Sequence, residues 1–167
     1  MVEVSPHDET LPSDSEAMKP TRKVRVSAGP VPDVEAVFRL LSSPHELPRL
    51  HPLIGKIEVE SSVRDGSREV FDFTIDEHVP MLGGLLKVPN RYRGRIVRDD
   101  SRPGVLRLSG WSSPGVRIEI RYDITPAQVT ETLWLGAPWW IEPFVFSTAL
   151  KAHQRTLEAV LALSQRP

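Results

Sequence analysis

Residues 116–124 read Val116-Arg117-Ile118-Glu119-Ile120-Arg121-Tyr122-Asp123-Ile124. Large apolar side chains alternate with charged ones along this whole segment. Because successive side chains of a β-strand point to opposite faces, a period of two predicts a strand with one buried and one solvated face. A sheet that is apolar on one side needs a second layer against that side.

Further strand patterns fill most of the chain after Ile54, each closed by turn residues. The turn at residues 64–67 predicts a hairpin between a strand containing Ile57 and a partner in which Phe71, Phe73 and Ile75 share one face. Other strands are predicted at 23–27, 86–98, 105–111 and 129–135. The chain therefore predicts an antiparallel sheet of about seven strands.

Two regions change to a helical period. Asp33 opens a segment in which Val34, Val37, Phe38 and Leu41 recur at helical spacing, and residues 45–50 are compatible with one further short turn. Near the C-terminus Pro143 suits a first helical position. Apolar positions then recur at steps of three or four, at Phe146, Leu150, His153, Leu157 and Leu161. This long amphipathic helix is expected to lie on the apolar face of the sheet.

Composition limits the class of protein. The 167 residues suit one domain, and 21 Lys and Arg against 22 Asp and Glu argue against a protein that mainly grips phosphate backbones. The absence of cysteine excludes disulfides, thiol nucleophiles and thiolate metal sites. Residues 1–22 are acidic, contain three prolines and lack an apolar period, so we expect a disordered tail there and one domain over 23–167.

No targeting or spanning segment is evident. The start of the chain is acidic and lacks the apolar core of a secretory signal. The longest apolar stretch, 133–146, contains Gly136, Pro138, Glu142 and Pro143, and falls short of the roughly 20 residues of a spanning helix. We expect a cytoplasmic protein with no stable membrane insertion.

The order of these elements resembles the START-like, or SRPBCC, helix-grip superfamily, particularly its bacterial polyketide cyclase/dehydrase branch. The likeness lies in the strand-to-helix entry at 26–38, the Pro44–Pro52 segment, where the family often has an aromatic residue, and the terminal helix. It covers about residues 23–163. The resemblance implies an α+β helix-grip fold: a curved antiparallel sheet wrapped on a long C-terminal helix, with one or two short helices after the first strand.

The same resemblance implies a cavity for a small hydrophobic molecule between sheet and helix, such as a lipid, a quinone or a polyketide-like metabolite. Large apolar inward positions with a few polar tips agree with the composition of such pockets. The alternative is that these side chains fill the core completely. Our candidate ligand-binding residues are Phe71, Phe73, Tyr92, Ile118, Ile120, Tyr122, Trp134, Phe146, Leu150 and His153.

Several polar candidates have two interpretations. His153, on the apolar stripe of the last helix, is either a proton shuttle or a hydrogen-bonded core residue. His51 and His45 either line the mouth of the cavity or are solvated loop residues. His78 follows Asp76 and Glu77, but no second ligand pair completes a metal site, so we expect neither metal nor cofactor.

Aromatic residues raise similar alternatives. Tyr92 and Tyr122 are expected to point inward, where each would donate a hydrogen bond to a carbonyl guest or serve as a core residue whose hydroxyl reaches the surface. The orientations of Trp111 and Trp134 stay open. Trp139 and Trp140 either form a gate or a transient membrane or protein contact, or pack against the loop at 81–86.

The predicted strand at 86–98 carries a local excess of positive charge, from Arg91, Arg93, Arg95 and Arg98. We interpret this stripe as a solvated outer face balanced by Glu119, Asp123 and Glu69, with nucleic acid or an acidic partner as the alternative. No nucleic acid is expected as a partner.

Three classes of function follow. We favour a binding module that carries or sequesters a hydrophobic molecule. The first alternative is an enzyme similar to the cyclases and dehydratases of the superfamily, with Tyr92, Tyr122 or His153 assisting proton transfer. Against it, no Ser-His-Asp grouping and no pair of inward carboxylates is evident in the sequence. The second alternative is a regulatory or interaction protein without a ligand.

Overall fold

The computed structural model describes residues 22–81, 86–113 and 115–165. Its elements are β1 (Arg22–Ala28), α1 (Val34–Ser42), α2 (Leu47–Leu50), β2 (Ile54–Asp65), β3 (Arg68–Met81), β4 (Leu86–Asp99), β5 (Val105–Ser112), β6 (Val116–Ile124), β7 (Val129–Gly136) and α3 (Glu142–Ser164). The predicted acidic tail lies outside the described residues except for Arg22, which begins β1.

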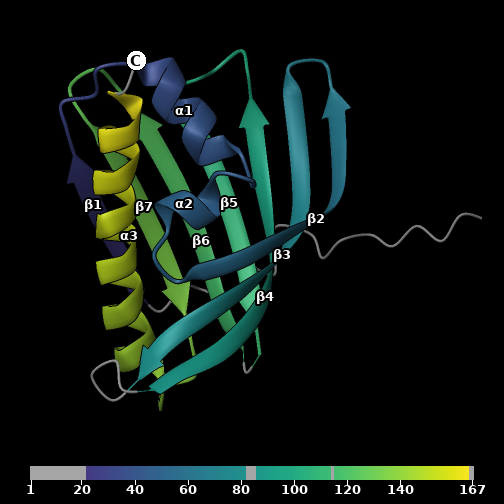
Figure 1. The fold of residues 1–167 in the computed structure, drawn as a ribbon, viewed down its shortest axis with the longest axis vertical. Helices are drawn as coiled ribbons and strands as arrows, with labels where there is room; N and C mark the ends of the chain where they lie inside the picture. The colour runs from purple at the N-terminus through teal and green to yellow at the C-terminus, as the bar shows by residue number, and fades with distance from the viewer. Residues whose placement is uncertain (1–21, 82–85, 114, 166–167) are drawn as a thin grey trace, which may run out of the picture.

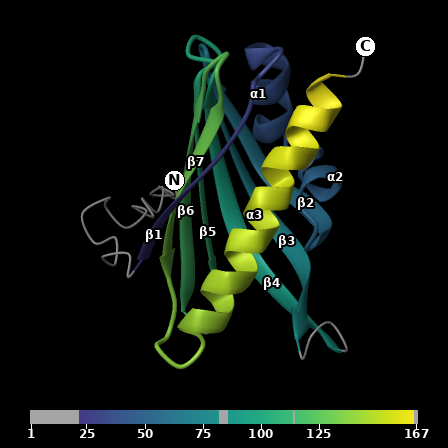
Figure 2. The same ribbon diagram turned by 90° about the vertical axis from the view of Figure 1, so that its left-hand side faces the viewer.

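The strands form one seven-stranded sheet in the order β1-β7-β6-β5-β4-β3-β2, and every neighbouring pair is antiparallel. The predicted α+β helix-grip architecture is confirmed. Figures 1 and 2 show the sheet curving around α3, with α1 and α2 on the same side. Two register shifts in β2, at Ile54/Lys56 and Val59/Ser61, mark the bulges that bend this edge of the sheet.

Local sequence explains where the helices begin. The side chain of Asp33 caps α1 by accepting a hydrogen bond from the backbone N–H of Ala36 at 2.9 Å. Proline stands near the start of α2, at Pro48, and of α3, at Pro143, where no intrahelical donor is lost. The short helical turn expected within 45–50 is confirmed as α2.

One glycine permits a close approach inside the sheet. Gly94 of β4 lies opposite Phe73 of β3, and a Cβ atom at Gly94 would stand 2.4 Å from Cε2 of the Phe73 ring. Phe73 therefore occupies space that only a glycine leaves free on the neighbouring strand. The close contact places the phenyl ring over β4, on the inner face of the sheet.

The hydrophobic core lies between the inner face of the sheet and the helices. Its fully buried members come from α1, β3, β4, β5, β7 and α3, and include Leu41, Ile75, Ile96, Leu106, Leu133 and Leu157. Several of the buried core residues, among them Ile75, also line the cavity described below.

Three arginines of β4 form ion pairs, and those of Arg91 and Arg95 lie on the outer face. Arg95 contacts Asp72 at 2.6 Å, Arg91 contacts Asp76 at 3.5 Å, and Arg98 contacts Glu69 at 3.4 Å. Arg98 and Glu69 follow Ile96 and Phe71 at a spacing of two, so this pair lies on the inner side of the sheet and the expectation that Arg98 and Glu69 belong to the outer face was wrong.

The two other expected partners were wrong. Asp123 pairs with Arg121, and Glu119 lies in register with Ser109 and Trp134. The reason is topological: β3 adjoins β4, whereas β6 is separated from β4 by β5.

No helix in the described residues is long and apolar enough to cross a membrane. The cytoplasmic location stays a prediction.

Candidate functional site

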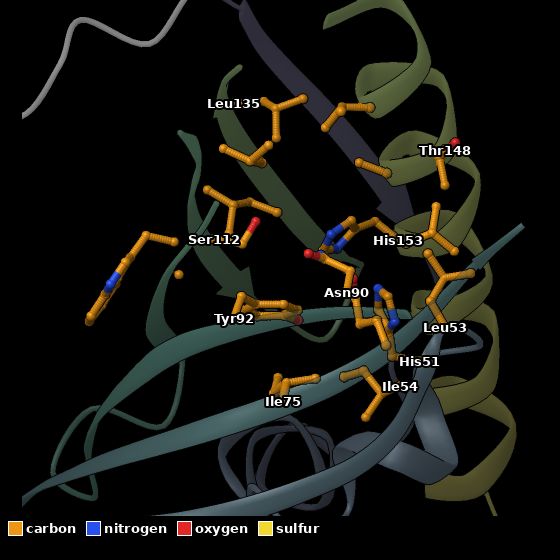
Figure 3. Close-up of a pocket in the computed structure, with 18 of the residues that line it drawn as sticks. His51, Leu53, Ile54, Ile75, Asn90, Tyr92, Ser112, Leu135, Thr148 and His153 are labelled. Carbon is orange, nitrogen blue, oxygen red and sulfur yellow. The ribbon is translucent and has the colours of Figure 1, made fainter. Parts of the chain in front are cut away.

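A cavity of about 420 Å³ lies between the inner face of the sheet and α3. Strands β3 to β7, α3 and the segment from α2 to β2 supply its walls. Figure 3 shows side chains from these elements surrounding a common space. The alternative of a completely filled core is therefore wrong. The apolar lining includes Leu53, Ile54, Ile75, Val79, Leu108, Leu135, Val145 and Ala149.

Six of the ten candidate residues line this cavity: Phe73, Tyr92, Ile118, Ile120, Tyr122 and His153. They come from four elements that are distant in sequence, and the curvature of the sheet brings them together. That they bind a ligand remains a prediction.

Trp134 and Phe146 lie elsewhere. In β7, Trp134 alternates with the inward Leu133 and Leu135, and the ammonium group of Lys23 lies 5.4 Å from the centroid of its ring. Its side chain therefore lies on the outer face. Phe146 is covered by the guanidinium of Arg22, 4.7 Å from its ring centroid, so it faces β1.

Leu150 and Phe71 are also outside the cavity lining. Leu150 follows Phe146 by one helical turn, about a quarter turn around α3 from the stripe formed by Val145, Ala149, His153 and Thr156. Phe71 shares the inner face with Phe73 but packs against the core nearer the β2–β3 turn. The stripe predicted on α3 was therefore rotated relative to the observed one.

A buried ion pair stands at the polar end of the cavity. Glu131 of β7 is completely buried, and its Oε1 atom lies 2.5 Å from Nδ1 of His153 on α3. The hydroxyl of Tyr122, directly across from Glu131 on β6, donates a hydrogen bond to the same oxygen at 3.2 Å. Burial by itself lowers the pKa of His153, but the carboxylates of Glu131 and, less strongly, Glu77 outweigh it and raise that pKa.

His51 faces this pair from the segment after α2. Its ring meets that of His153 edge to face, with 5.2 Å between the centroids. Burial, reinforced by the neighbouring His153, lowers the pKa of His51 to about 3. Two adjacent imidazoles are therefore held in opposite states, His51 neutral and His153 inclined to carry a proton.

A second carboxylate, Glu77 of β3, belongs to the same polar end. Asn90 of β4 donates to its Oε2 atom at 3.5 Å, and the hydroxyl of Tyr92 also bonds to it. Burial raises the pKa of Glu77. Burial, together with the Glu77 carboxylate, raises the pKa of Tyr92 well above its usual value. Tyr92 thus stays a neutral donor to Glu77.

These contacts bear on both interpretations of the tyrosines, whose role in binding stays a prediction. A phenol has one proton, and each tyrosine directs it to a buried carboxylate, Tyr122 to Glu131 and Tyr92 to Glu77. For Tyr122 the alternative of a core residue whose hydroxyl reaches the surface is wrong, because that hydroxyl is buried against Glu131. Neither hydroxyl is left to donate to a carbonyl guest without breaking its present bond.

Sequence reasoning missed both carboxylates. Glu77 continues the inward series Phe73-Ile75, and Glu131 continues Val129 and Leu133. The alternation that identified the strands would also have placed these carboxylates inward. The expectation that no inward pair of carboxylates exists was therefore wrong.

The remaining histidines have separate positions. His51 lines the cavity, whereas His45 is exposed on the same segment. His78 is exposed and follows the inward Glu77, so the two side chains leave β3 on opposite faces. Within residues 22–81, 86–113 and 115–165, no cluster of His, Cys, Asp or Glu is arranged to hold a metal ion.

Exposed aromatic residues border the cavity. Trp139 and Trp140 are 84% and 60% exposed, and Trp140 and Phe144 contribute to the cavity lining. Trp111, 47% exposed, lies at the cavity edge in register with Arg93 and Arg117. Residues 82–85 of the loop proposed to pack against Trp139 and Trp140 lie outside the described residues.

Comparisons by sequence identify no relative: no family model matches the chain, and no curated protein matches it. Solved structures do match. The Zhui aromatase/cyclase from Streptomyces sp. R1128 aligns with a TM-score of 0.62 at 14% identity, over 87% of this chain and 94% of that chain.

A START superfamily protein from Mycobacterium smegmatis aligns with a TM-score of 0.56 at 12% identity, over 86% of this chain and 97% of the other. Ara h 8.0201 aligns with a TM-score of 0.53 at 12% identity, over 84% and 98% of the two chains. The chain has the START-like, SRPBCC helix-grip fold that these structures share.

Proposed function

We propose that this START-like helix-grip domain binds a small hydrophobic molecule in the cavity between sheet and α3, and carries or sequesters it. The observation that carries the proposal is the cavity of about 420 Å³ with mostly apolar walls. Lipids, quinones and polyketide-like molecules are the classes we consider. The similarity in fold to an aromatase/cyclase and to a START superfamily protein supports this choice.

The expected affinity follows from the apolar area that a guest would bury. About 300 Å² of apolar surface removed from water is worth roughly 7 kcal/mol before the costs of association. Dissociation constants around the micromolar range follow for a guest that fits well.

The entrance is proposed at the exposed aromatic residues. Trp140 and Phe144 belong both to the surface and to the cavity lining, so a guest would pass them on entry. Trp139 and Trp140 would then also be the site of any transient membrane or protein contact. Flotation with liposomes tests the membrane contact directly, and no binding to neutral or anionic vesicles would contradict it.

The test uses N-phenyl-1-naphthylamine, an uncharged dye whose fluorescence rises in apolar surroundings. The wild-type protein is expected to bind it saturably with a micromolar dissociation constant. Ala149 lines the cavity, so Ala149→Trp is expected to fill the space and abolish binding. Ala162 is exposed on the same helix, and Ala162→Trp is the matched control that retains it. Equal binding by both variants would contradict the proposal.

A second candidate function is a cyclase- or dehydratase-type enzyme that uses the same cavity. The observation favouring it is His153, which lines the cavity and is oriented by Glu131 in the manner of a general acid or base. Loss of turnover of a polyketide-like substrate in His153→Gln, with dye binding retained, would support the enzyme. If the wild-type protein shows no turnover, the enzyme is rejected and the carrier function stands.

A further inference from the structure

The polar end of the cavity has few hydrogen-bonding groups left for a guest. Tyr122 donates to Glu131, while Tyr92 and Asn90 donate to Glu77. The hydroxyl of Thr156 donates to the backbone carbonyl of Ala152 within α3. Each of the three hydroxyl groups would have to break an existing bond to donate to a ligand, whereas Asn90 keeps a second N–H and its carbonyl oxygen.

The two histidines are different. Nδ1 of His51 and Oε2 of Glu131 are buried and have no hydrogen-bond partner within the described residues, and of these two residues only His51 lines the cavity. His153 turns Nδ1 toward Glu131, so its other ring nitrogen, Nε2, lies on the opposite side of the ring. Figure 3 shows both histidines at the same end of the cavity, beside Asn90. An unpaired buried polar group costs free energy that a suitable guest would recover.

We infer that the paired rings of His51 and His153 recognise an uncharged hydroxyl group, so the cavity selects apolar alcohols or phenols over hydrocarbons and over carboxylates. The inference rests on the function proposed above and specifies its ligand class. An imidazolium donates only, and a neutral imidazole has one donor and one acceptor nitrogen. One hydroxyl oxygen can accept from His153 and donate to His51, whose rings stand 5.2 Å apart.

Charge argues against an anionic head group. The proton of His153 already faces the carboxylate of Glu131, and Glu77 lies on the same side of the cavity. A guest carboxylate would add a third carboxyl group to one imidazolium in a buried site, and would lose its hydration. A hydrocarbon avoids that cost but leaves His51 without a partner.

The test compares naphthalene, 2-methoxynaphthalene, 2-naphthol and 2-naphthoate at pH 7 as competitors of N-phenyl-1-naphthylamine on the full chain. The four share one ring system and differ in the group offered to the histidines. One net hydrogen bond corresponds to about a 3- to 10-fold change in affinity. We expect 2-naphthol to compete about 3- to 10-fold better than naphthalene and 2-methoxynaphthalene, and 2-naphthoate at least 10-fold worse than 2-naphthol.

His51→Leu is expected to reduce the ratio of 2-naphthol to 2-methoxynaphthalene affinity to about one, because both can still accept from His153, whereas His45→Leu, at an exposed histidine of the same segment, leaves the wild-type ratio. Should a variant fail to fold, the order of the four affinities for the wild-type protein tests the inference by itself. Equal competition by all four compounds, or strongest competition by 2-naphthoate, would overturn the inference and leave the proposed function standing. Failure of the dye and of naphthalene to bind at all would reject both.

Discussion

On the outer face of the sheet Arg95 contacts Asp72 at 2.6 Å, and both side chains are 30% exposed. On the inner side His153 contacts Glu131 at 2.5 Å, and the Glu131 side chain has no exposure at all. The two ion pairs are similar in length. If the outer pair separates, water solvates both ions, so the pair contributes little to stability. The ions of the inner pair are buried and have no water to replace the lost partner. Only the inner pair is therefore expected to control stability and ligand choice.

The largest effect is expected for Glu131→Gln, which removes the charge of the inner carboxylate. It leaves the imidazolium of His153 buried without its carboxylate, and we expect a loss of about 3–5 kcal/mol in the free energy of unfolding at pH 5. Because the folded pKa of His153 is raised, its stabilisation is fully present below pH 6.5 and is lost as pH rises through the folded pKa. The deficit should therefore shrink at high pH. Urea denaturation at several pH values measures it.

The double variant Glu131→Leu/His153→Leu is the control for this prediction. Replacing both members of a buried pair by apolar residues leaves no charge to desolvate, so much of the lost stability should return. A single Glu131→Gln variant as stable as the wild type at pH 5 would show that the pair is not formed as described.

His51 tests the neutral member of the inner cluster. Its folded pKa of about 3 lies below the value of 6.5 in the unfolded chain, so only the unfolded chain takes up a proton as the pH falls below 6.5. Acid therefore favours unfolding, by about 2 kcal/mol at pH 5 for this one group. His51→Gln is expected to remove that contribution, which urea midpoints at pH 5 and pH 7 will measure.

His45→Gln, at the exposed histidine nearby, should keep the wild-type difference between the two pH values. The prediction for His51 fails if both variants retain the same acid sensitivity. Acid destabilises the fold through His51 and stabilises it through His153. The contribution of His51 is therefore the difference in acid sensitivity between His51→Gln and the wild type.

Packing on the inner face is tested by Gly94→Ala. The new methyl group would meet the ring of Phe73 at 2.4 Å, so the ring must move, at a cost of about 1–2 kcal/mol in stability. Phe73 lines the cavity, and dye affinity should fall as well. The second change Phe73→Leu removes the ring atoms in conflict and should restore part of the stability. Additive effects in this double-mutant cycle would contradict the contact.

The smallest effect is expected on the outer face. Arg95→Met removes the partly exposed pair with Asp72 and should lower the free energy of unfolding by less than about 1 kcal/mol. Added salt screens this pair, so the difference between variant and wild type should be smaller at high salt. The ion pair with Arg95 lowers the pKa of Asp72. NMR titration of the Asp72 carboxyl should therefore show that pKa rise toward its usual value in the variant. A loss comparable with that of Glu131→Gln would erase the distinction between the two faces.

Most of the fold could be predicted because strand alternation and helix spacing are local signals. Residues 116–124 form β6 with the predicted inward set, and the C-terminal helix was placed to within one residue of its observed start, Glu142. The rotation of its apolar stripe could not be predicted. Phe146 and Leu150 suit a buried helix face, but Arg22 of the distant β1 covers Phe146, and no local pattern reports that contact.

Half of the polar site was missed for a different reason. For Glu77 and Glu131 the alternation of the strand places the side chain inward, whereas carboxylates are usually exposed. The compensating partners, Tyr92 and Tyr122, stand on neighbouring strands, so the conflict is resolved only when the register is known. His51 lies in a segment without periodicity, where sequence offers no face to assign.

The central claim, that a hydrophobic guest occupies the cavity between the sheet and α3, is tested most directly by NMR of isoleucine δ-methyl groups during titration with naphthalene. The methyl groups of Ile54, Ile75, Ile118 and Ile120 line the cavity and should shift through the ring current of the guest. Those of Ile57, Ile96 and Ile124, in the sheet but outside the cavity lining, should stay in place. Shifts confined to the second group, or no saturable shifts, would contradict the account.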